Sequence, residues 1–475
     1  MTATFNPPVD VTALNHIVFL AQENRSFDHY FGALRDYWKR AGYKDQSFDG
    51  LPQFNPVSGD PPLQGPAPTN PGCDPTSPPP GDCIFDTNNP ITSFPMITQC
   101  SENTSPSWDE SHVIWNYGDQ VGLYPAQLNG FVYAAGHDAR NDGFNDTDGK
   151  RAMGYYDDSS LNYYYFMATN FATSDAWFHP VMTRTSPNRE YLIAATSQGR
   201  VYPNGTDAQD QTLLTAKTIF EELQAAGITW KIFVDPQGSP CTGPPYDPAC
   251  LMTLSYMQNF TYSQTILSTY PQNIAPISEY FDDLKNGTLP QVVQIETATD
   301  GGYDEHPSVS DLTPTNIQTG ANYVSGLINQ LMQSTSWKDS AFILTYDEYG
   351  GLYDHVSPYP TVSPDDIKPV DFLPNDVCNG KSTGPICDFT YTGYRVPLIV
   401  VSPYTKKNYV SHTRADFTAI LKLIETRFKV NSLTKRDAAQ IDMTEFFDFK
   451  NPAWMTPPTP PVQLTNGACY MNQVP

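Results

Sequence analysis

The sequence predicts an α/β fold in which helices cover both faces of a mostly parallel central sheet, with long proline-rich loop insertions. Short apolar segments typical of buried strands alternate with longer segments whose apolar residues recur at helical spacing. Hydrophobic residues make up 39% of the 475 residues and charged residues only 16%, so the chain can form a sizeable core. The 44 prolines favour long ordered loops over a helical bundle.

The predicted strands are short apolar runs, which suit a parallel sheet that is buried on both faces. They lie at residues 16–21, 228–234, 289–296, 340–348 and 396–403. The predicted helices lie at residues 27–40, 159–170, 187–197, 212–227, 320–334 and 416–428. The helix at 212–227 shows the pattern well, because its apolar residues follow a helical period and Gly227 supplies a stop.

We expect a single domain over residues 1–475 with two irregular segments. Residues 51–106 are rich in Pro, Gly and Asn and contain three cysteines, so we interpret them as an insertion that contains disulfides. Residues 451–475 form a proline-rich C-terminal tail. The length alone would suggest about three domains, but an α/β domain with long insertions accounts for it equally well.

The chain is strongly acidic, with 51 Asp and Glu against 27 Lys and Arg and a net charge of −24. Such a surface repels nucleic acid and anionic membranes, so we expect no nucleic-acid partner. No run approaches the ~20 apolar residues of a transmembrane helix. The sequence indicates no particular oligomeric state.

The eight cysteines predict disulfides, because their number is even, they lie in loop-like sequence and none forms a C-x-x-C pair. Cys241 with Cys250 and Cys378 with Cys387 are the expected pairs, whereas the pairing of the other four stays open. Buried free thiols are the alternative. Disulfides predict an oxidising compartment, so we expect a secreted or periplasmic protein. No signal peptide is visible, which fits a mature form with an added Met.

Acidic and amide side chains follow three of the predicted strands. Glu23 and Asn24 follow the first, Glu296 ends the third, and Asp347 and Glu348 end the fourth. The carboxyl ends of parallel strands meet at one edge, where sites of α/β proteins lie. Carboxylates grouped there repel each other unless a cation is present, and oxygen donors favour a hard divalent ion. The alternative is that each residue caps the helix that follows.

A hydroxyl pair precedes the predicted helix at 187–197. Pro187 suits the first turn, which places Thr185 and Ser186 at the helix N-terminus, where backbone N–H groups attract anions. A hydroxyl at this point beside a metal can become a nucleophile. Ordinary N-capping by either residue is the alternative.

Three histidines come close to these residues in the sequence or in the predicted fold. Gly350 and Gly351 allow a tight turn that returns His355 towards Asp347, and His306 and His112 lie in other polar loops. His29 and His179 adjoin candidate site residues, whereas we interpret the remaining histidines as structural. These are His16, His137 and His412.

Four motifs resemble the bacterial phospholipase C and acid phosphatase family. They are ENRSFDHYFG (23–32), TSPNREYL (185–192), EHPS (305–308) and TYDEYGGLYDHVSP (345–358). Weaker matches follow in the family's order, so the resemblance extends from about residue 15 to 450. It implies a fold similar to alkaline phosphatase and the sulfatases, one metal held by oxygen ligands, and hydrolysis through a phosphorylated hydroxyl.

The resemblance also implies roles for individual residues. It makes Thr185 the nucleophile, with its oxygen on the metal. The other metal ligands it implies are Glu23, Asn24, Asp347 and Glu348. It places His112, His306 and His355 around the phosphate, and His355 or His306 is the expected proton donor to the leaving oxygen. An all-oxygen site favours calcium or magnesium, with zinc and manganese as alternatives.

The predicted function is phospholipase C-type hydrolysis of phosphate esters through a phospho-threonine intermediate, with a phospholipid head group as one candidate substrate. An acid phosphatase acting on phosphomonoesters is the first alternative. A sulfatase-like enzyme or phosphonate hydrolase is less favoured, because Thr185 cannot become the aldehyde that sulfatases use. A non-enzymatic secreted metal-binding module is the last alternative. Tyr155, Tyr156 and residues 163–165 either hold a choline cation or pack in the core.

Overall fold

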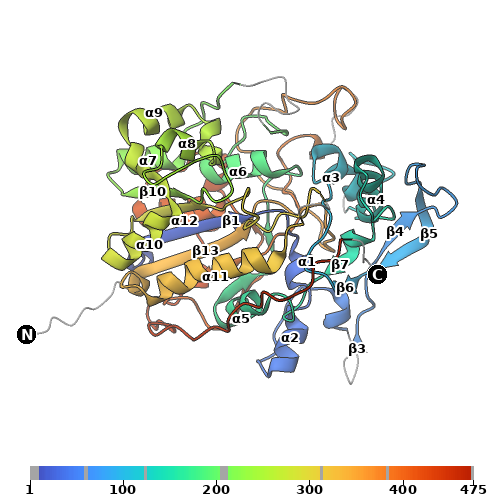
Figure 1. Ribbon diagram of the computed structural model, residues 1–475, viewed down its shortest axis with the longest axis horizontal. Helices are drawn as coiled ribbons and strands as arrows, with labels where there is room; N and C mark the ends of the chain where they lie inside the picture. The colour runs from blue at the N-terminus through green and yellow to red at the C-terminus, as the bar shows by residue number, and fades with distance from the viewer. Residues whose placement is uncertain are drawn as a thin grey trace, which may run out of the picture.

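The computed structural model describes residues 10–57, 63–121, 126–203, 212–310, 314–380 and 385–471. Its centre is an eight-stranded sheet in the order β11-β10-β12-β1-β13-β14-β8-β15 (Figure 1). The bounds in that order are Ile274–Pro276, Trp230–Val234, Val292–Glu296, His16–Gln22, Ser340–Tyr346, Ile399–Val401, Ala172–Ser174 and Tyr409–Ser411. All strands are parallel to their neighbours except β14, which is antiparallel to both β13 and β8. The predicted mostly parallel sheet is confirmed.

The middle of the sheet is formed by β1 and β13. The two strands pair in register from His16 with Ser340 to Gln22 with Tyr346. Every residue of β13 is buried, which explains its continuous apolar sequence. Both strands therefore end at the same level, and the residues that follow them are held rigidly side by side.

Two groups of helices cover this sheet. The first comprises α5 (Asn162–Asn170), α10 (Ile277–Asn286) and α11 (Ile317–Gln333), and α11 contacts both others. Figure 1 shows α11 in front of the strands. The second comprises α6 (Thr185–Ala194), α7 (Ile219–Ala225) and α12 (Ala419–Phe428), which pack on one another through α6. Because β13 is buried on both faces, the two groups form the outer layers of a three-layer α/β domain.

Some predicted boundaries differ from the structure. The helix expected at 27–40 is two helices, α1 (Phe27–Phe31) and α2 (Leu34–Ala41). Leu51 packs so tightly against the junction that a Cβ at Gly32 would lie 2.6 Å from its Cγ. The helix expected at 212–227 begins at Ile219, because Thr218 and Glu221 form a capping box there.

A lobe formed by residues between α2 and α5 lies at one end of the sheet, on the right of Figure 1. It contains β4 (Thr69–Cys73), β5 (Phe85–Thr92), β6 (Phe94–Pro95), β7 (Gly154–Tyr155), α3 (Trp108–Trp115) and α4 (Phe131–Asp142). Trp115 and Phe131 belong to a separate small hydrophobic cluster, which also includes Tyr349 and Tyr394 from the main domain. The segment expected as an insertion at 51–106 is thus part of a larger packed unit.

The remaining strands and α-helices are short and lie outside the central sheet. They are β2 (Pro56–Val57), β3 (Leu63–Gln64), β9 (Trp177–Phe178), β16 (Ala415–Asp416), α8 (Pro248–Met252), α9 (Tyr262–Thr269) and α13 (Lys435–Ala438). Among the described residues, no helix combines the length and apolar character needed to cross a bilayer.

Four disulfides join the eight cysteines. The predicted pairs Cys241–Cys250 and Cys378–Cys387 are confirmed, and Cys73–Cys83 closes a third short loop. The fourth, Cys100–Cys469, joins residues 369 positions apart. Figure 1 shows the C-terminal segment running below the sheet to the lobe, where this bond fixes it.

Candidate active site

The site lies at the carboxyl ends of three neighbouring parallel strands. Glu296 is the last residue of β12, and Glu23 and Asp347 directly follow β1 and β13. All three carboxyl groups are at most 3% exposed. The sequence-based expectation that these strand ends meet at one edge is therefore correct.

Arg189 on α6 lies among these carboxylates. One terminal nitrogen is 2.7 Å from Glu23 Oε1, the other is 3.4 Å from Glu296 Oε2, and Nε is 3.5 Å from Asp347 Oδ2. Sequence reasoning gave Arg189 no role. Its position four residues after Thr185 could have predicted this role, because that spacing puts both side chains on the same face of one helix.

Thr185 is the first residue of α6, and no side chain caps this helix. Its hydroxyl donates to Glu23 Oε2 at 3.0 Å and lies 3.4 Å from Asn24 Oδ1. The neighbouring hydroxyl of Ser186 instead accepts from Asn259 at 3.1 Å. Of the two hydroxyls that the sequence left open, the structure brings only Thr185 to the carboxylates.

Asn24 is held in an unusual backbone conformation, with φ +57°. Its N–H donates to Asp347 Oδ1 at 3.0 Å. Gly350, with φ +70°, lies so close that a Cβ there would be 2.3 Å from the Asn24 carbonyl oxygen. Only glycine fits at this contact, which explains the first glycine of the Gly350-Gly351 pair. The tight packing fixes Asn24 beside the Asp347-Glu348 pair.

The carboxyl groups at this site are poorly compensated. Burial raises the pKa of Asp347 and of Glu348 well above their ordinary values, and nearby carboxylates add to the effect. Burial also acts to raise the pKa of Glu23, but the guanidinium of Arg189 and the hydrogen bond from Thr185 help to bring it below its usual value. Two buried oxygens, Asp347 Oδ2 and Glu348 Oε1, accept no hydrogen bond from any described residue.

The two oxygens without a donor indicate whether the site could bind a divalent cation. Three buried carboxylates share the guanidinium of Arg189, and the amide oxygen of Asn24 and the Thr185 hydroxyl lie beside Glu23. Carboxylate, amide and hydroxyl oxygens are the donors that hard divalent cations prefer. The residues present therefore fit such an ion.

His306 contacts this cluster through Asn24. Asn24 Nδ2 lies 3.1 Å from His306 Nε2, and His306 Nδ1 lies 2.5 Å from the Pro307 carbonyl oxygen. An amide nitrogen can only donate, so the contacts assign the proton to Nδ1 and leave Nε2 as the acceptor. His306 is partly exposed, so its Nε2 side is accessible from solvent.

The residue before His306 is a fully buried carboxylate, Glu305, with φ +69°. It accepts hydrogen bonds from the hydroxyls of Tyr30, Tyr164 and Tyr346 and from Gln22. These bonds hold a strained backbone position and so fix the direction of His306. Sequence reasoning did not find this role, because its partners come from four separate segments.

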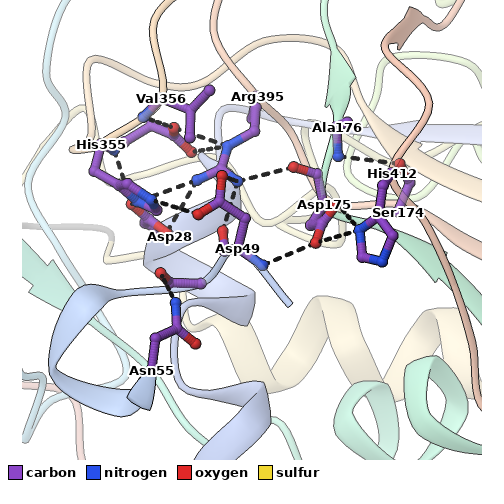
Figure 2. A network of polar contacts seen from close by, with 12 residues as sticks. Asp28, Asp49, Asn55, Ser174, Asp175, Ala176, His355, Val356, Arg395 and His412 are labelled. Atoms are coloured by element: carbon purple, nitrogen blue, oxygen red, sulfur yellow. Dashed lines mark hydrogen bonds and ion pairs between the residues drawn. The ribbon is translucent and has the colours of Figure 1, made fainter. Parts of the chain in front are cut away.

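His355 lies in a second acidic cluster (Figure 2). Its Nδ1 is 2.6 Å from Asp28 and its Nε2 is 3.2 Å from Asp49. Burial alone would lower the pKa of His355, but these carboxylates raise it to about 10. Asp28, Asp354 and His355 are close enough to share a cation, but Arg395 lies 2.9 Å from Asp354 and 3.3 Å from Asp28. A guanidinium thus already supplies the positive charge in this cluster.

The two clusters are connected by paired segments. Arg25 N–H donates to the Glu348 carbonyl at 3.0 Å, and the Ser26 hydroxyl donates to the Tyr353 carbonyl at 2.7 Å. His355 N–H then donates to Asp28 at 2.8 Å. The chain after β1 therefore runs beside the chain after β13, and it carries His355 along the same side of the domain.

His112 is not brought to the carboxylates by any contact in the described residues. Its two nitrogens lie 2.6 Å from the Trp108 carbonyl and 3.0 Å from the Ile386 carbonyl, and burial lowers its pKa. His29 and His179 are also buried with lowered pKa values, that of His179 to about 3. The predicted phosphate contact of His112 is the site prediction that this arrangement supports least.

Comparison with known proteins agrees with the geometry. A model of the phosphoesterase family matches residues 14–431. The chain is 30% identical to phospholipase C B of Mycobacterium tuberculosis over 483 residues, which cover 94% of this chain and 80% of the relative. It is 29% identical to a non-hemolytic phospholipase C of Burkholderia pseudomallei, covering 94% of this chain and 61% of that protein.

Among solved structures, the chain matches a protein of the alkaline phosphatase superfamily from Vibrio parahaemolyticus. The match covers 58% of this chain and 63% of that one, with 10% identity and a TM-score of 0.33. Because this TM-score is low, the match is not used to assign the fold, which follows from the topology of the central sheet.

Proposed function

The chain belongs to the phosphoesterase family and is a phosphoric ester hydrolase, and from this premise we propose phospholipase C-type cleavage with Thr185 as the nucleophile. One observation carries the proposal. The Thr185 hydroxyl stands at the uncapped N-terminus of α6, 3.0 Å from Glu23 and beside Asn24. A helix N-terminus favours a phosphate, and the carboxylates favour a cation, so both would meet at this oxygen.

One divalent metal ion is part of the proposal. Glu23, Asn24, Thr185, Asp347 and Glu348 would hold it, and their oxygen chemistry favours calcium or magnesium over zinc or manganese. When bound, such an ion neutralises charge on phosphoryl oxygens and makes a neighbouring hydroxyl more acidic. The orphan oxygens of Asp347 and Glu348 support this assignment.

Four side chains of the protein have separate roles in the proposed reaction. Thr185 Oγ attacks phosphorus while its proton passes to Glu23 Oε2, and the bond from phosphorus to the leaving oxygen breaks. Water later displaces the phosphoryl group from Thr185, and Glu23 returns the proton to Oγ. We propose His355 as the donor to the leaving oxygen, because its raised pKa keeps it protonated at neutral pH. His306, whose Nε2 accepts, would take the proton of the attacking water. Glu23 orients the Thr185 hydroxyl.

The substrate preference is the finer part of the proposal. Relatives of the chain are named phospholipase C, which favours a phosphodiester over the monoester of an acid phosphatase. Tyr156 and residues 163–165 are at most 1% exposed, so they pack in the core and do not form a choline site. A sulfatase-like reaction is disfavoured, because Thr185 cannot supply the aldehyde that sulfatases use.

We also propose a secreted or periplasmic location. Four disulfides join all eight cysteines. Such a number is typical of oxidising compartments.

Turnover of matched chromogenic esters tests the function. Purified protein with added magnesium or calcium should release p-nitrophenol from a phosphodiester, and chelator should stop the release. A hundredfold higher kcat/KM for p-nitrophenyl phosphate than for the diester would instead establish the acid phosphatase alternative. Turnover of neither ester, with metal bound, would identify a binding protein.

A further inference from the structure

A polar cavity of about 290 Å³ adjoins the candidate active site. Asp235 lines it directly after β10, and Thr297 lines it directly after β12. These strands and β1 are consecutive in the sheet, so the cavity opens over the same edge as Glu23. Two strand spacings separate the ends of β10 and β1, which is about 10 Å.

Ser255 and Tyr256 form the cavity side of the wall that separates the cavity from the active site, and Glu296 and Arg189 form the other side. The Ser255 hydroxyl donates to Glu296 Oε1 at 3.0 Å, and the ring of Tyr256 lies 4.9 Å from the guanidinium of Arg189. Glu296 and Arg189 are the residues that connect to Glu23 and Thr185. Because the cavity and Thr185 lie on the same edge of the sheet, a group attached to a phosphate at Thr185 can extend across the part-exposed Tyr256 to the cavity.

Two loops build the opposite side. Gly238, with φ +81°, is so close to the second loop that a Cβ there would lie 2.5 Å from the Asp300 carbonyl oxygen. Gln237 Nε2 donates to the Tyr303 hydroxyl at 2.6 Å. The second loop continues to His306, so one segment carries both cavity residues and a candidate catalytic histidine.

The chemistry of the lining decides which group fits. Its charged side chains among the described residues are the carboxylates of Asp235 and Asp300, so a further anionic group is disfavoured. Besides Ser255 and Tyr256 in the wall, six uncharged side chains offer hydroxyl or amide groups. They are Gln237, Ser239, Thr253, Gln258, Thr297 and Thr299.

A quaternary ammonium group fits this cavity poorly. Cation-binding sites for such groups are built from several aromatic faces. The aromatic ring in the lining is that of Tyr256, and it already stacks on Arg189. The mixture of hydroxyl, amide and carboxylate groups in the lining instead matches a molecule with many hydroxyls, because each hydroxyl both donates and accepts.

We propose that this cavity is a subsite for a hydroxyl-rich substituent, a sugar or polyol, on the phosphate ester. The inference rests on the proposed function and specifies its substrate class. The substituent would stay attached to the phosphoryl group near Thr185 and hydrogen-bond to Gln237 and Gln258 in the cavity.

Three p-nitrophenyl diesters with the same leaving group test the subsite. Their second alcohols are the 6-hydroxyl of glucose, cyclohexylmethanol and choline, so the first two share a ring size and differ in hydroxyls. We expect kcat/KM to be at least tenfold higher for the glucose ester than for the other two. Gln237→Ala and Gln258→Ala should each lower the glucose-to-cyclohexylmethyl ratio at least threefold.

Gln264→Ala is the matched control, because Gln264 is exposed on α9 outside the cavity lining and should leave the ratio unchanged. Two cavity variants are used so that one poorly folded protein does not decide the result. A preference for the choline ester, equal rates for all three, or ratios unaffected in both variants would overturn the subsite alone. No turnover of any ester would overturn the proposed function and the subsite together.

Discussion

Arg189 and Arg395 are both buried arginines surrounded by carboxylates, and the two clusters differ in how completely they are satisfied. Around Arg395, Nε contacts Asp354, one terminal nitrogen contacts Asp28, and the other donates to two backbone carbonyls. No polar atom of Asp28, Asp354, His355 or Arg395 is among the unpartnered buried atoms of the described residues. Around Arg189, by contrast, oxygens of Asp347 and Glu348 have no donor.

The two clusters have similar residues, but this difference distinguishes a cluster with a structural role from one that binds a ligand. Buried polar groups without partners are costly, and a cluster of unpartnered carboxylate oxygens at one edge of the sheet is explained by a ligand that completes it. The Arg395 cluster is complete within the chain, and we interpret it as the support that holds His355 in place. The Arg189 cluster lacks partners that a cation would supply.

The largest expected effect is at the nucleophile. Thr185→Ala should lower kcat by at least about 10⁴-fold, because covalent catalysis is lost with the attacking oxygen. Ser186→Ala, the matched control, should retain activity close to wild type. Steady-state turnover with thermal unfolding as the folding check measures both. An inactive Ser186→Ala beside an active Thr185→Ala would show that the other hydroxyl reacts.

The second expected effect is the response to metal removal. Chelator should abolish turnover and lower the unfolding temperature, since a ligand at 100 times its Kd stabilises the folded state by about 2.7 kcal/mol. Asp347→Asn should weaken this stabilisation by magnesium, whereas Asp354→Asn should leave it in place. Differential scanning calorimetry with and without magnesium gives the comparison. Full activity in chelator, with no metal by elemental analysis, would contradict the assignment.

The third effect compares the two arginines directly. Arg395→Met leaves the buried Asp354 without its arginine partner and leaves Asp28 with His355 alone, which should cost about 3–5 kcal/mol of the free energy of unfolding. Arg189→Met in saturating magnesium should cost less, because the bound ion offsets part of the charge. Denaturant titrations measure both losses. Arg40→Met on the surface is the control, and it should lower the free energy of unfolding by less than about 1 kcal/mol. Equal losses at the two arginines would remove the distinction drawn above.

The smallest effect concerns pH. The folded-state pKa of His355 is raised to about 10, above its usual value in an unfolded chain of about 6.5. Its contribution to stability is therefore fully present below pH of about 6.5 and is lost as the pH rises towards 10. The groups that face it are Asp28, Asp49 and Arg395.

His355→Gln should flatten the decline in unfolding temperature between pH 6.5 and 10. His137→Gln, at a more exposed ion pair with Asp82, is the control and should leave the decline as it is. An identical slope in wild type and His355→Gln would show that His355 carries no raised pKa.

Sequence patterns predicted the parts of the fold that depend on local periodicity. The buried strands β1, β10, β12 and β13 and the meeting of their carboxyl ends followed from short apolar runs and the polar residues behind them. The two short disulfide loops also followed from local spacing. The antiparallel direction of β14 did not, because an apolar run carries no information on strand direction.

The parts that sequence reasoning missed depend on long-range contacts. Arg189 and Arg395 acquire their roles only when distant carboxylates surround them. The tyrosines that hold Glu305 lie up to 275 positions away in the sequence. The polar cavity likewise combines loops after β10 and β12 with the segment around Tyr256, and none of these carries a recognisable motif alone.

The Cys100–Cys469 bond has a consequence for the timing of maturation. A cross-link that closes a loop of this size removes more unfolded-chain entropy than the short loops do, about 6 kcal/mol against about 3 in the chain-entropy model. It can form only after the chain has been extended by the 369 positions that separate Cys469 from Cys100. At about 5–20 residues per second, a nascent chain waits roughly 20–70 seconds between the appearance of the two thiols. Throughout that interval Cys100 is available to the wrong cysteines, so correct maturation depends on an isomerase or on the short loops closing first.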